Sequence, residues 1–296
     1  MSIPLAENLD HRHLHVFFLA SLPPIRACIF DMDGLLINSE DMLTLSVNLI
    51  LEKYGRPPFT QSIRAQMMGV PGSIHSDLFH DWAKLPISRQ QFSREAAEQM
   101  QLHFPNCTPL PGAEDILSNL TRARSVSSGD NIELALASGT TGPTYSLKTA
   151  RPETKQLLSY FDPDRRVLGD DPRVPKGRGK PAPDIYLVAL QSLNATKHGP
   201  DSSTKPPIMP NECLVFEDSV VGVEAARRAG MRVVWIPHPS VAAEYQTRQK
   251  ETLAGSLNLD GVGDGWQHQQ IEDGWAESIS SLEHFNYGRY GIEVPS

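Results

Sequence analysis

Five short apolar segments, separated by stretches with helical periodicity, constrain the fold of this chain more than any other feature. The expected strands are residues 26–30, 132–137, 166–169, 213–216 and 232–236. Each is bounded by turn-forming residues, which is typical of strands buried on both faces of a parallel sheet. Because these strands alternate with helices, the sequence predicts an α/β fold with a Rossmann-like parallel sheet core.

Polar residues follow four of these five strands directly. The clusters are Asp31-Met32-Asp33-Gly34, Ser138-Gly139-Thr140, Asp170-Asp171 and Glu217-Asp218-Ser219. In open parallel sheets, ligands bind in the crevice beyond the carboxyl ends of the strands. The sequence therefore predicts that these clusters meet at one crevice.

The stretch between the first two expected strands spans about 100 residues, far more than one crossover needs. Helical patterns begin at Ser39 and again over residues 60–68, 73–85 and 88–103. We expect residues 40–109 to form a helical cap, residues 25–39 and 110–296 the α/β core, and residues 1–24 an N-terminal extension. A helical module at the mouth of a sheet is well placed to close over a substrate.

The first helix of this insertion has clear end signals. Ser39, followed by two acidic residues, is a good N-terminus, and Gly55 is expected to stop the helix. Its predicted apolar face consists of Met42, Leu45, Leu49 and Ile50.

Asp31 and Asp33 lie two positions apart immediately after an apolar strand, and Gly34 allows the chain to turn sharply. Two carboxylates at this spacing can divide labour, one as nucleophile and the other as acid and base. The same pattern is common in acidic turns that cap a helix, so this pair alone leaves both interpretations open.

Glu217 and Asp218 bring two more carboxylates to the same expected crevice. Crowded carboxylates disfavour each other's ionised forms unless a cation compensates, and a hard ion with oxygen ligands such as Mg²⁺ fits that role. A purely structural interpretation also exists, because Ser219 is a good cap for a helix over residues 220–229 that Gly230 would end. The two interpretations are compatible.

Lys180 and Ser138 are uninformative when each is taken alone. A single lysine is most often solvated, and a serine at a strand end is ordinary. The glycine-rich approach to Lys180 does not form a phosphate-binding P-loop, because Pro181 stands where that motif needs Ser or Thr.

Taken together, the clusters resemble the four motifs of the haloacid dehalogenase-like (HAD) hydrolases. The residues that match these motifs are Asp31-Met32-Asp33-Gly34, Ser138 after Leu134-Ala135-Leu136-Ala137, Lys180, and Glu217-Asp218, in this order and at strand ends. The resemblance covers residues 26 to 239, and the insertion is similar to the helical cap of that family. Within the family, residues 30–36, 111–114, 168–172 and 213–218 are most similar to pseudouridine-5′-phosphatase-like members.

The resemblance implies a magnesium-dependent phosphomonoester hydrolase that acts through an aspartyl-phosphate intermediate. Asp31 would be the nucleophile. Asp33 would be the general acid and base, and we expect its pKa to be raised by neighbouring carboxylates and the phosphate. The phosphoryl group would be bound by Ser138, Gly139 and Lys180.

The resemblance also implies the ligands of the metal. Mg²⁺ would be held by the carboxylate of Asp31, the main-chain carbonyl of Asp33, and Asp218, with Glu217 binding directly or through water. The substrate would be a small phosphorylated metabolite, with pseudouridine 5′-phosphate the preferred guess and sugar phosphates or nucleoside monophosphates close behind. Specificity would come from the cap around residues 64–76.

Three other functions compete with hydrolysis. A β-phosphoglucomutase-like phosphomutase would present a cap histidine where this chain has Leu43, and basic residues where it has Met68 and Gly69. A dehalogenase would need no metal and no acidic residue at position 33. A non-catalytic phosphometabolite-binding protein is disfavoured by the intact set of motif residues.

Composition narrows the partners and the compartment. With 27 Lys and Arg against 35 Asp and Glu, the net charge of −8 argues against nucleic acid as the main ligand. No apolar run reaches the length of a membrane span. The three cysteines form no C-x-x-C pair, so we expect small buried hydrophobes and a cytoplasmic protein. A monomer is the simplest expectation, and alternating histidines at 11–15 are a weak candidate metal site.

Overall fold

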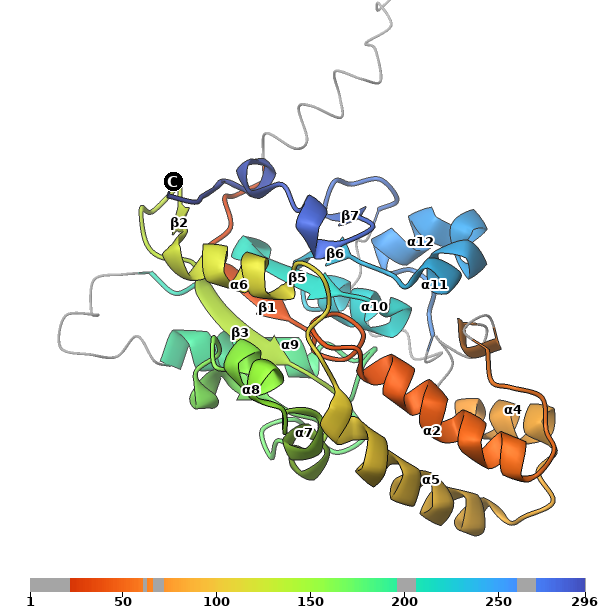
Figure 1. The fold of residues 1–296 in the computed structure, drawn as a ribbon. Coiled ribbons are helices and arrows are strands. Elements are labelled where there is room, and N and C mark those ends of the chain that lie inside the picture. Colours follow the sequence, from red (N-terminus) through yellow and green to blue (C-terminus); the bar gives the residue numbers. More distant parts are fainter. Residues whose placement is uncertain (1–21, 61–62, 66–71, 196–205, 260–269, 296) are drawn as a thin grey trace, which may run out of the picture.

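The computed structural model describes residues 22–60, 63–65, 72–195, 206–259 and 270–295. Six parallel strands form one sheet in the order β4-β3-β1-β5-β6-β7 (Figure 1). The strands are β1 (Ala27–Phe30), β3 (Glu133–Ala137), β4 (Arg166–Val167), β5 (Cys213–Glu217), β6 (Arg232–Trp235) and β7 (Ala276–Ser278). All five predicted strands are present, which confirms the α/β Rossmann-like core. β7 is an addition that the sequence pattern did not indicate.

β4 is two residues shorter than predicted, whereas the other four predicted strands agree within one residue at each end. β4 ends at Val167 and does not extend to Gly169. The amide of Gly169 instead donates to the carbonyl of Thr140, so the chain leaves the ladder there and crosses the end of β3. A Cβ at Gly169 would overlap the backbone of Gly139, so this close crossing requires glycine.

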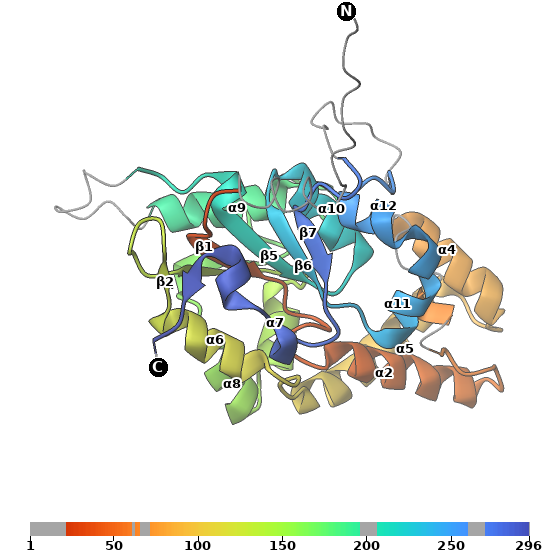
Figure 2. The same cartoon turned by 90° about the horizontal axis from the view of Figure 1, so that it is seen from above.

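The sheet is covered by helices on both faces (Figure 2). The helices around it are α6 (Ala113–Arg122), α7 (Gly142–Lys148), α8 (Pro152–Leu158), α9 (Asp184–Ala195), α10 (Val220–Arg228), α11 (Pro239–Glu244) and α12 (Gln249–Ala254). Helices α6 and α8 cover one face, and α9 and α10 cover the other. A short antiparallel pair of β2 (Arg124–Ser125) and β8 (Ile292–Glu293) lies outside the main sheet.

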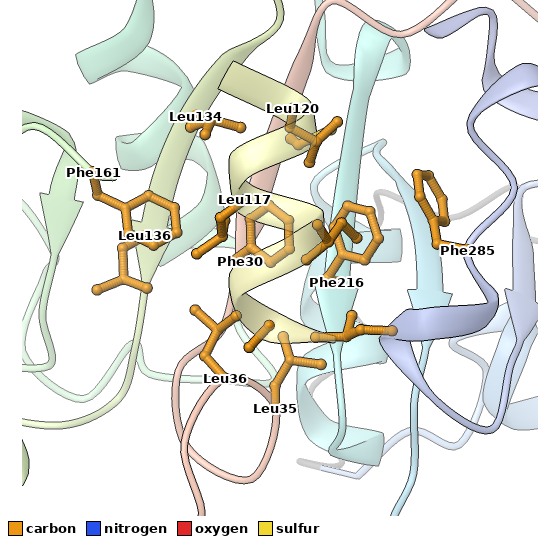
Figure 3. Packing of buried hydrophobic residues seen from close by; sticks show 14 of the residues in the cluster. Phe30, Leu35, Leu36, Leu117, Leu120, Leu134, Leu136, Phe161, Phe216 and Phe285 are labelled. Atoms are coloured by element: carbon orange, nitrogen blue, oxygen red, sulfur yellow. The ribbon is translucent and has the colours of Figure 1, made fainter. Parts of the chain in front are cut away.

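The alternation of side chains along β1 builds both halves of the core. Cys28 and Phe30 face α6, whereas Ala27 and Ile29 face α9 and α10. Phe30 stacks on Phe216 of β5 at a centroid distance of 4.4 Å, beneath the leucines of α6 (Figure 3). This packing fixes the strand whose next residue is Asp31.

The long insertion after β1 is helical, as the sequence indicated. Helices α2 (Ser39–Lys53), α4 (Gly72–Ala83) and α5 (Arg89–His103) extend away from the sheet (Figure 1). Their shared core consists of Val47, Leu51, Phe59, Phe79 and Ala83. The bounds 40–109 for an independent cap domain stay a prediction.

The predicted apolar face of α2 is partly wrong. Leu45 is 41% exposed and Leu49 is 37% exposed, whereas Val47, Ile50 and Leu51 are buried. The prediction failed because α2 packs along α5 and beside α4, so its buried stripe is set by those neighbours. The end of the helix is as expected, since Gly55 follows with a positive φ of 62°.

The chain enters and leaves the helical insertion at one place. Ile37 forms a bridge with Pro109. The amide of Asn38 donates to the carbonyl of Thr108 at 3.1 Å, and the amide of Thr108 donates to the side-chain oxygen of Asn38 at 2.8 Å. Two adjacent, hydrogen-bonded crossings therefore connect the helices to the sheet a few residues from Asp33.

Several predictions concern residues outside those described. They include the histidines at 11–15, most of the N-terminal extension, the segment Met68-Gly69, and most of the stretch from Gly261 to Gly274. Within the described residues, no helix is long and apolar enough to cross a membrane. The three cysteines are buried, as expected.

Candidate active site

The strand register brings the predicted site residues to one edge of the sheet. Phe30 pairs with Leu136 on one side and with Phe216 on the other. Asp31 and Ser138, which follow β1 and β3, and Glu217, the last residue of β5, therefore lie at neighbouring strand ends. The amide of Asp31 donates to the carbonyl of Phe216 at 3.0 Å, which carries the ladder one residue beyond β1. Three of the four predicted clusters therefore come together. In the fourth, Asp170 accepts from the amide of Gly142 and Asp171 pairs with Arg173.

Lys180 is held between two buried carboxylates. Its Nζ donates to Oδ1 of Asp31 at 2.5 Å and to Oε1 of Glu217 at 2.6 Å. The hydroxyl of Tyr186, which lies on α9, donates to the same Oε1 at 2.5 Å. The side chain of Lys180 is only 10% exposed, so its charge acts on these groups with little screening by solvent.

The charges in this cluster do not balance. Burial raises the pKa of Asp31 to about 7; the ammonium of Lys180 opposes this shift, and the carboxylates of Glu217 and Asp33 add to it. Burial also raises the pKa of Asp218, and the charges of Glu217 and Asp31 raise it further. Burial alone would lower the pKa of Lys180, but Asp31 and Glu217 raise it well above its ordinary value. Although the charge of Arg64 also lowers the pKa of Asp218, the pKa of both Asp31 and Asp218 stays raised, so the positive charge of Lys180 does not balance the carboxylates around it.

Asp33 has different surroundings. Oδ1 accepts hydrogen bonds from Oγ of Ser39 at 2.5 Å and from Nζ of Lys148 at 2.6 Å. Oδ2 accepts from Oγ1 of Thr140 at 2.6 Å and from Oγ of Ser138 at 3.1 Å. Four donors from three parts of the chain thus hold one carboxylate.

The expected rise in the pKa of Asp33 is wrong for this structure. Burial does raise the pKa, but the charge of Lys148 and the hydrogen bonds from Lys148, Ser39 and Thr140 outweigh it and hold the pKa below its ordinary value. The prediction took account of neighbouring carboxylates and missed the lysine at the end of α7.

Ser39 also differs from its expected role. It is the first residue of α2, and the cap position belongs to Asn38, whose side chain makes no hydrogen bond to the start of the helix. The hydroxyl of Ser39 instead donates a hydrogen bond to Oδ1 of Asp33. By contrast, Ser219 does cap α10, because its Oγ accepts from the amide of Gly222 at 3.1 Å.

Glu217 is not placed as a metal ligand in this structure. Its side chain is fully buried, and Oε1 already accepts from Lys180 and Tyr186. Oε2 accepts from the amide of Ser219 at 3.1 Å and from its hydroxyl at 3.0 Å. With both oxygens engaged by protein donors, Glu217 anchors Lys180.

The remaining oxygen donors fit a hard divalent cation. Among the described residues, no group of three or more His, Cys, Asp or Glu side chains is arranged to hold a metal. The expected set needs fewer side chains, because it combines the carboxylates of Asp31 and Asp218 with the main-chain carbonyl of Asp33. Burial raises the pKa of both Asp31 and Asp218, and the charge of Asp31 raises that of Asp218 further, which is a condition that a shared cation relieves.

Gly34 allows Asp218 to approach this turn. Its φ is +75°, and a Cβ there would overlap the carboxylate of Asp218. A cavity of about 340 Å³ opens beside these two residues, between the sheet edge and α2. Arg64, His238 and Leu282 are among its lining residues. Asp218 lines this cavity whereas Asp31 and Asp33 do not, and its volume is large enough for a small metabolite beside Asp218.

Sequence reasoning missed three residues that hold the site together. Lys148 and Tyr186 lie inside helical patterns, where a lysine is usually solvated and a tyrosine usually belongs to the core, so neither carried a signal. Thr140 did carry one, since it belongs to the polar cluster after β3, but only Ser138 and Gly139 were assigned a role. Gly139 is exposed at this edge, with open space around it.

Comparison with known proteins agrees with this geometry. A family model described as haloacid dehalogenase-like hydrolase matches residues 25–230. The chain is 35% identical to a protein of Saccharomyces cerevisiae named as a probable pseudouridine-5′-phosphatase, over 90% of this chain and 98% of the other. It is also 35% identical to (DL)-glycerol-3-phosphatase 2 of Arabidopsis thaliana, over 74% of this chain and 82% of the other.

A solved structure extends the comparison to the fold. The HAD hydrolase of family IA, variant 3, from Entamoeba histolytica matches with a TM-score of 0.58 at 18% identity, over 90% of this chain and 97% of the other. This likeness supports the fold, whereas the relatives above confirm the expectation of an enzyme of the phosphatase class. From the order of its motifs, the convergence of their side chains and these matches, the chain belongs to the haloacid dehalogenase-like hydrolase family.

Proposed function

We propose that this protein is a magnesium-dependent phosphomonoester hydrolase that acts on a small phosphorylated metabolite through an aspartyl-phosphate. One observation carries the proposal: two carboxylates on one turn, Asp31 and Asp33, each have their own buried lysine at the edge of the sheet. This arrangement separates a nucleophile from an acid and base within three residues.

In the first step, an oxygen of Asp31 attacks the phosphorus atom of the substrate. The bond between phosphorus and the leaving alcohol oxygen breaks, and the protonated form of Asp33 gives its proton to that oxygen and becomes a carboxylate. Because the pKa of Asp33 is low in this structure, the protonated form has to arise when the phosphate binds. Lys180 contacts Asp31 and would offset the repulsion between this carboxylate and the phosphate, while Ser138 and the amides near Gly139 would bind the transferring oxygens.

In the second step, water attacks the phosphorus of the aspartyl-phosphate and Asp33 takes a proton from that water. The bond to the oxygen of Asp31 breaks, which releases inorganic phosphate and restores the free carboxylate. The lowered pKa of Asp33 suits this second task, because the ionised form is the base.

Asp31, Asp218 and the main-chain carbonyl of Asp33 would hold Mg²⁺. When bound, the ion supplies positive charge that screens the phosphate from the crowded carboxylates. The site needs such a cation because the charge of Lys180 offsets only part of the negative charge of the surrounding carboxylates.

For the substrate we propose pseudouridine 5′-phosphate, with sugar phosphates and glycerol phosphate as the closest alternatives. The support is the identity to relatives named for the first and the last of these, together with a cavity of about 340 Å³ beside Asp218. A cytoplasmic location and a monomeric state stay predictions.

The test is a panel of phosphomonoesters assayed with and without magnesium, with kcat/KM compared across substrates. We expect phosphate release that stops when EDTA removes the metal and returns when Mg²⁺ is added. If isomerised sugar phosphate accumulates in place of free phosphate, the chain is a phosphomutase. If pseudouridine 5′-phosphate ranks no better than glycerol phosphate, the substrate assignment fails and only the enzyme class stands.

A further inference from the structure

We propose that Lys148 is a positioning residue for the general acid and base, and that it ties the place of Asp33 to the junction between the sheet and the helical insertion. The inference rests on the proposed function, because it assigns Asp33 the transfer of a proton to the leaving group. It adds a residue that none of the four sequence motifs contains.

The contacts of Lys148 show a side chain committed to this task. It is the last residue of α7, its side chain is 8% exposed, and its Nζ lies 2.6 Å from Oδ1 of Asp33. The same Nζ donates to Oγ1 of Thr140 at 2.9 Å, and Thr140 in turn donates to Oδ2 of Asp33. Lysine and threonine therefore hold both oxygens of the carboxylate from one side.

Lys148 and Asp33 also contact residues of the helical insertion. The Nζ of Lys148 lies 4.8 Å from the centroid of the Phe104 ring, directly after α5, within the range of a cation–π contact. Ser39, the first residue of α2, donates to the same Oδ1 of Asp33. Ser39, which follows the first crossing, and Phe104, which precedes the second, thus each contribute a contact to the Asp33–Lys148 pair.

This geometry matters because an aspartate side chain can rotate about two bonds. A proton donor acts efficiently only when it is fixed within hydrogen-bonding reach of the leaving oxygen. The hydroxyls of Ser39, Ser138 and Thr140 can each rotate to other acceptors, whereas the buried ammonium supplies a charged contact that selects one place for the carboxylate. Loss of Lys148 also removes the charge that lowers the pKa of Asp33, which by itself favours the protonated acid. We expect the lost placement of the carboxylate to outweigh this effect, so that proton donation is impaired more than substrate binding.

The decisive experiment compares two leaving groups in the variant Lys148→Met, which keeps the length of the side chain and removes its charge. Glycerol 3-phosphate needs a proton on its departing alkoxide, whereas p-nitrophenyl phosphate releases nitrophenolate, a weak base that departs without one. We expect kcat/KM for glycerol 3-phosphate to fall roughly 10- to 100-fold and that for p-nitrophenyl phosphate to change by no more than about threefold. The KM for either substrate should change little.

Matched variants separate positioning from general damage. Lys148→Arg keeps the charge and should restore much of the lost selectivity. Lys155→Met changes an exposed lysine on α8 in the same way and should leave both substrates unaffected. Asp33→Asn should show the same bias against glycerol 3-phosphate, more strongly. If Lys148→Met does not fold, the two substrates are compared in Thr140→Val. This variant removes the hydroxyl that contacts both Lys148 and Asp33.

The outcomes are distinct. A selective loss on glycerol 3-phosphate with rescue by arginine supports the inference. An equal loss on both substrates, or no loss on either, overturns the inference while leaving the proposed function in place. A wild-type chain with magnesium that releases phosphate from neither substrate, nor from any member of the phosphomonoester panel, overturns the proposed function itself. If the panel identifies another alkyl phosphate as the substrate, that ester replaces glycerol 3-phosphate in the comparison.

Discussion

Asp31 and Asp33 are two residues apart on one turn, and each is bonded to a buried lysine, yet the two carboxylates differ in character. The pKa of Asp31 is raised to about 7, whereas that of Asp33 is held below its ordinary value. Lys180 must serve Glu217 as well as Asp31, while Lys148 faces Asp33 among neutral hydroxyls. Because both residues are buried aspartates, the difference in pKa between them is set by the ratio of carboxylates to cations around each group.

The largest expected effect comes from Asp31→Asn. Because the amide cannot form the aspartyl-phosphate, phosphate release should fall by at least about 10⁴-fold, while the melting temperature does not fall. Asparagine removes a buried charge that other carboxylates crowd, so the substitution should not lower the free energy of unfolding. The control is Asp81→Asn on the exposed side of α4, which should retain full activity. Turnover within tenfold of the wild type would exclude Asp31 as the nucleophile.

Lys180→Met tests the crowded side of the comparison. The change leaves Asp31 and Glu217 buried without their shared counter-charge, so the free energy of unfolding should drop by about 3–5 kcal/mol. We expect kcat to decrease about 10²- to 10³-fold as well. Chemical denaturation and phosphate release provide the two measurements. Lys176→Met, at an exposed position of the same loop, is the control, and equal stability of the two variants would contradict the account.

Gly34→Ala tests whether the turn must stay open for Asp218. A Cβ at this position would both strain a backbone with φ of +75° and overlap the carboxylate of Asp218. Gly55→Ala is a matched control, because Gly55 has φ of +62° and nothing nearby for a Cβ to meet. Both variants should lose about 1 kcal/mol of stability from strain. Only Gly34→Ala should also lower the magnesium-dependent rate of phosphate release. If both variants lose activity to the same extent, backbone strain and not the overlap with Asp218 explains the loss.

Tyr186→Phe has the smallest expected effect. It removes one hydroxyl that donates to Oε1 of Glu217 and leaves the contact of Lys180 intact. We expect a loss of about 1–2 kcal/mol of unfolding free energy and a change in kcat of only a few fold. Denaturation curves of the variant and the wild type measure this. A loss of activity as large as that of Lys180→Met would mean that Tyr186 takes part in the chemistry directly.

The sequence predicted five of the six strands and three of the four polar clusters at the site, because buried parallel strands and the polar residues at their ends are local patterns. The five predicted strands form, and Asp31, Ser138, Lys180 and Glu217 come together. The exposed faces of α2 were harder to predict, since Leu45 and Leu49 have the spacing of a buried stripe and yet lie at the surface. Which stripe is buried depends on α4 and α5, and the sequence of α2 alone contains no information about them.

By itself, the sequence determined five of the six strands of the main sheet, their order along the chain, and which acidic residues stand at their carboxyl ends. Only the tertiary structure decided how those acids are balanced: Lys148 lies 115 residues from Asp33 in the chain and Lys180 lies 149 from Asp31. Electrostatic environment depends on distance in space and on burial, and neither quantity is encoded in the spacing of residues along the chain. The opposite pKa shifts of Asp31 and Asp33 therefore arise from the folded arrangement.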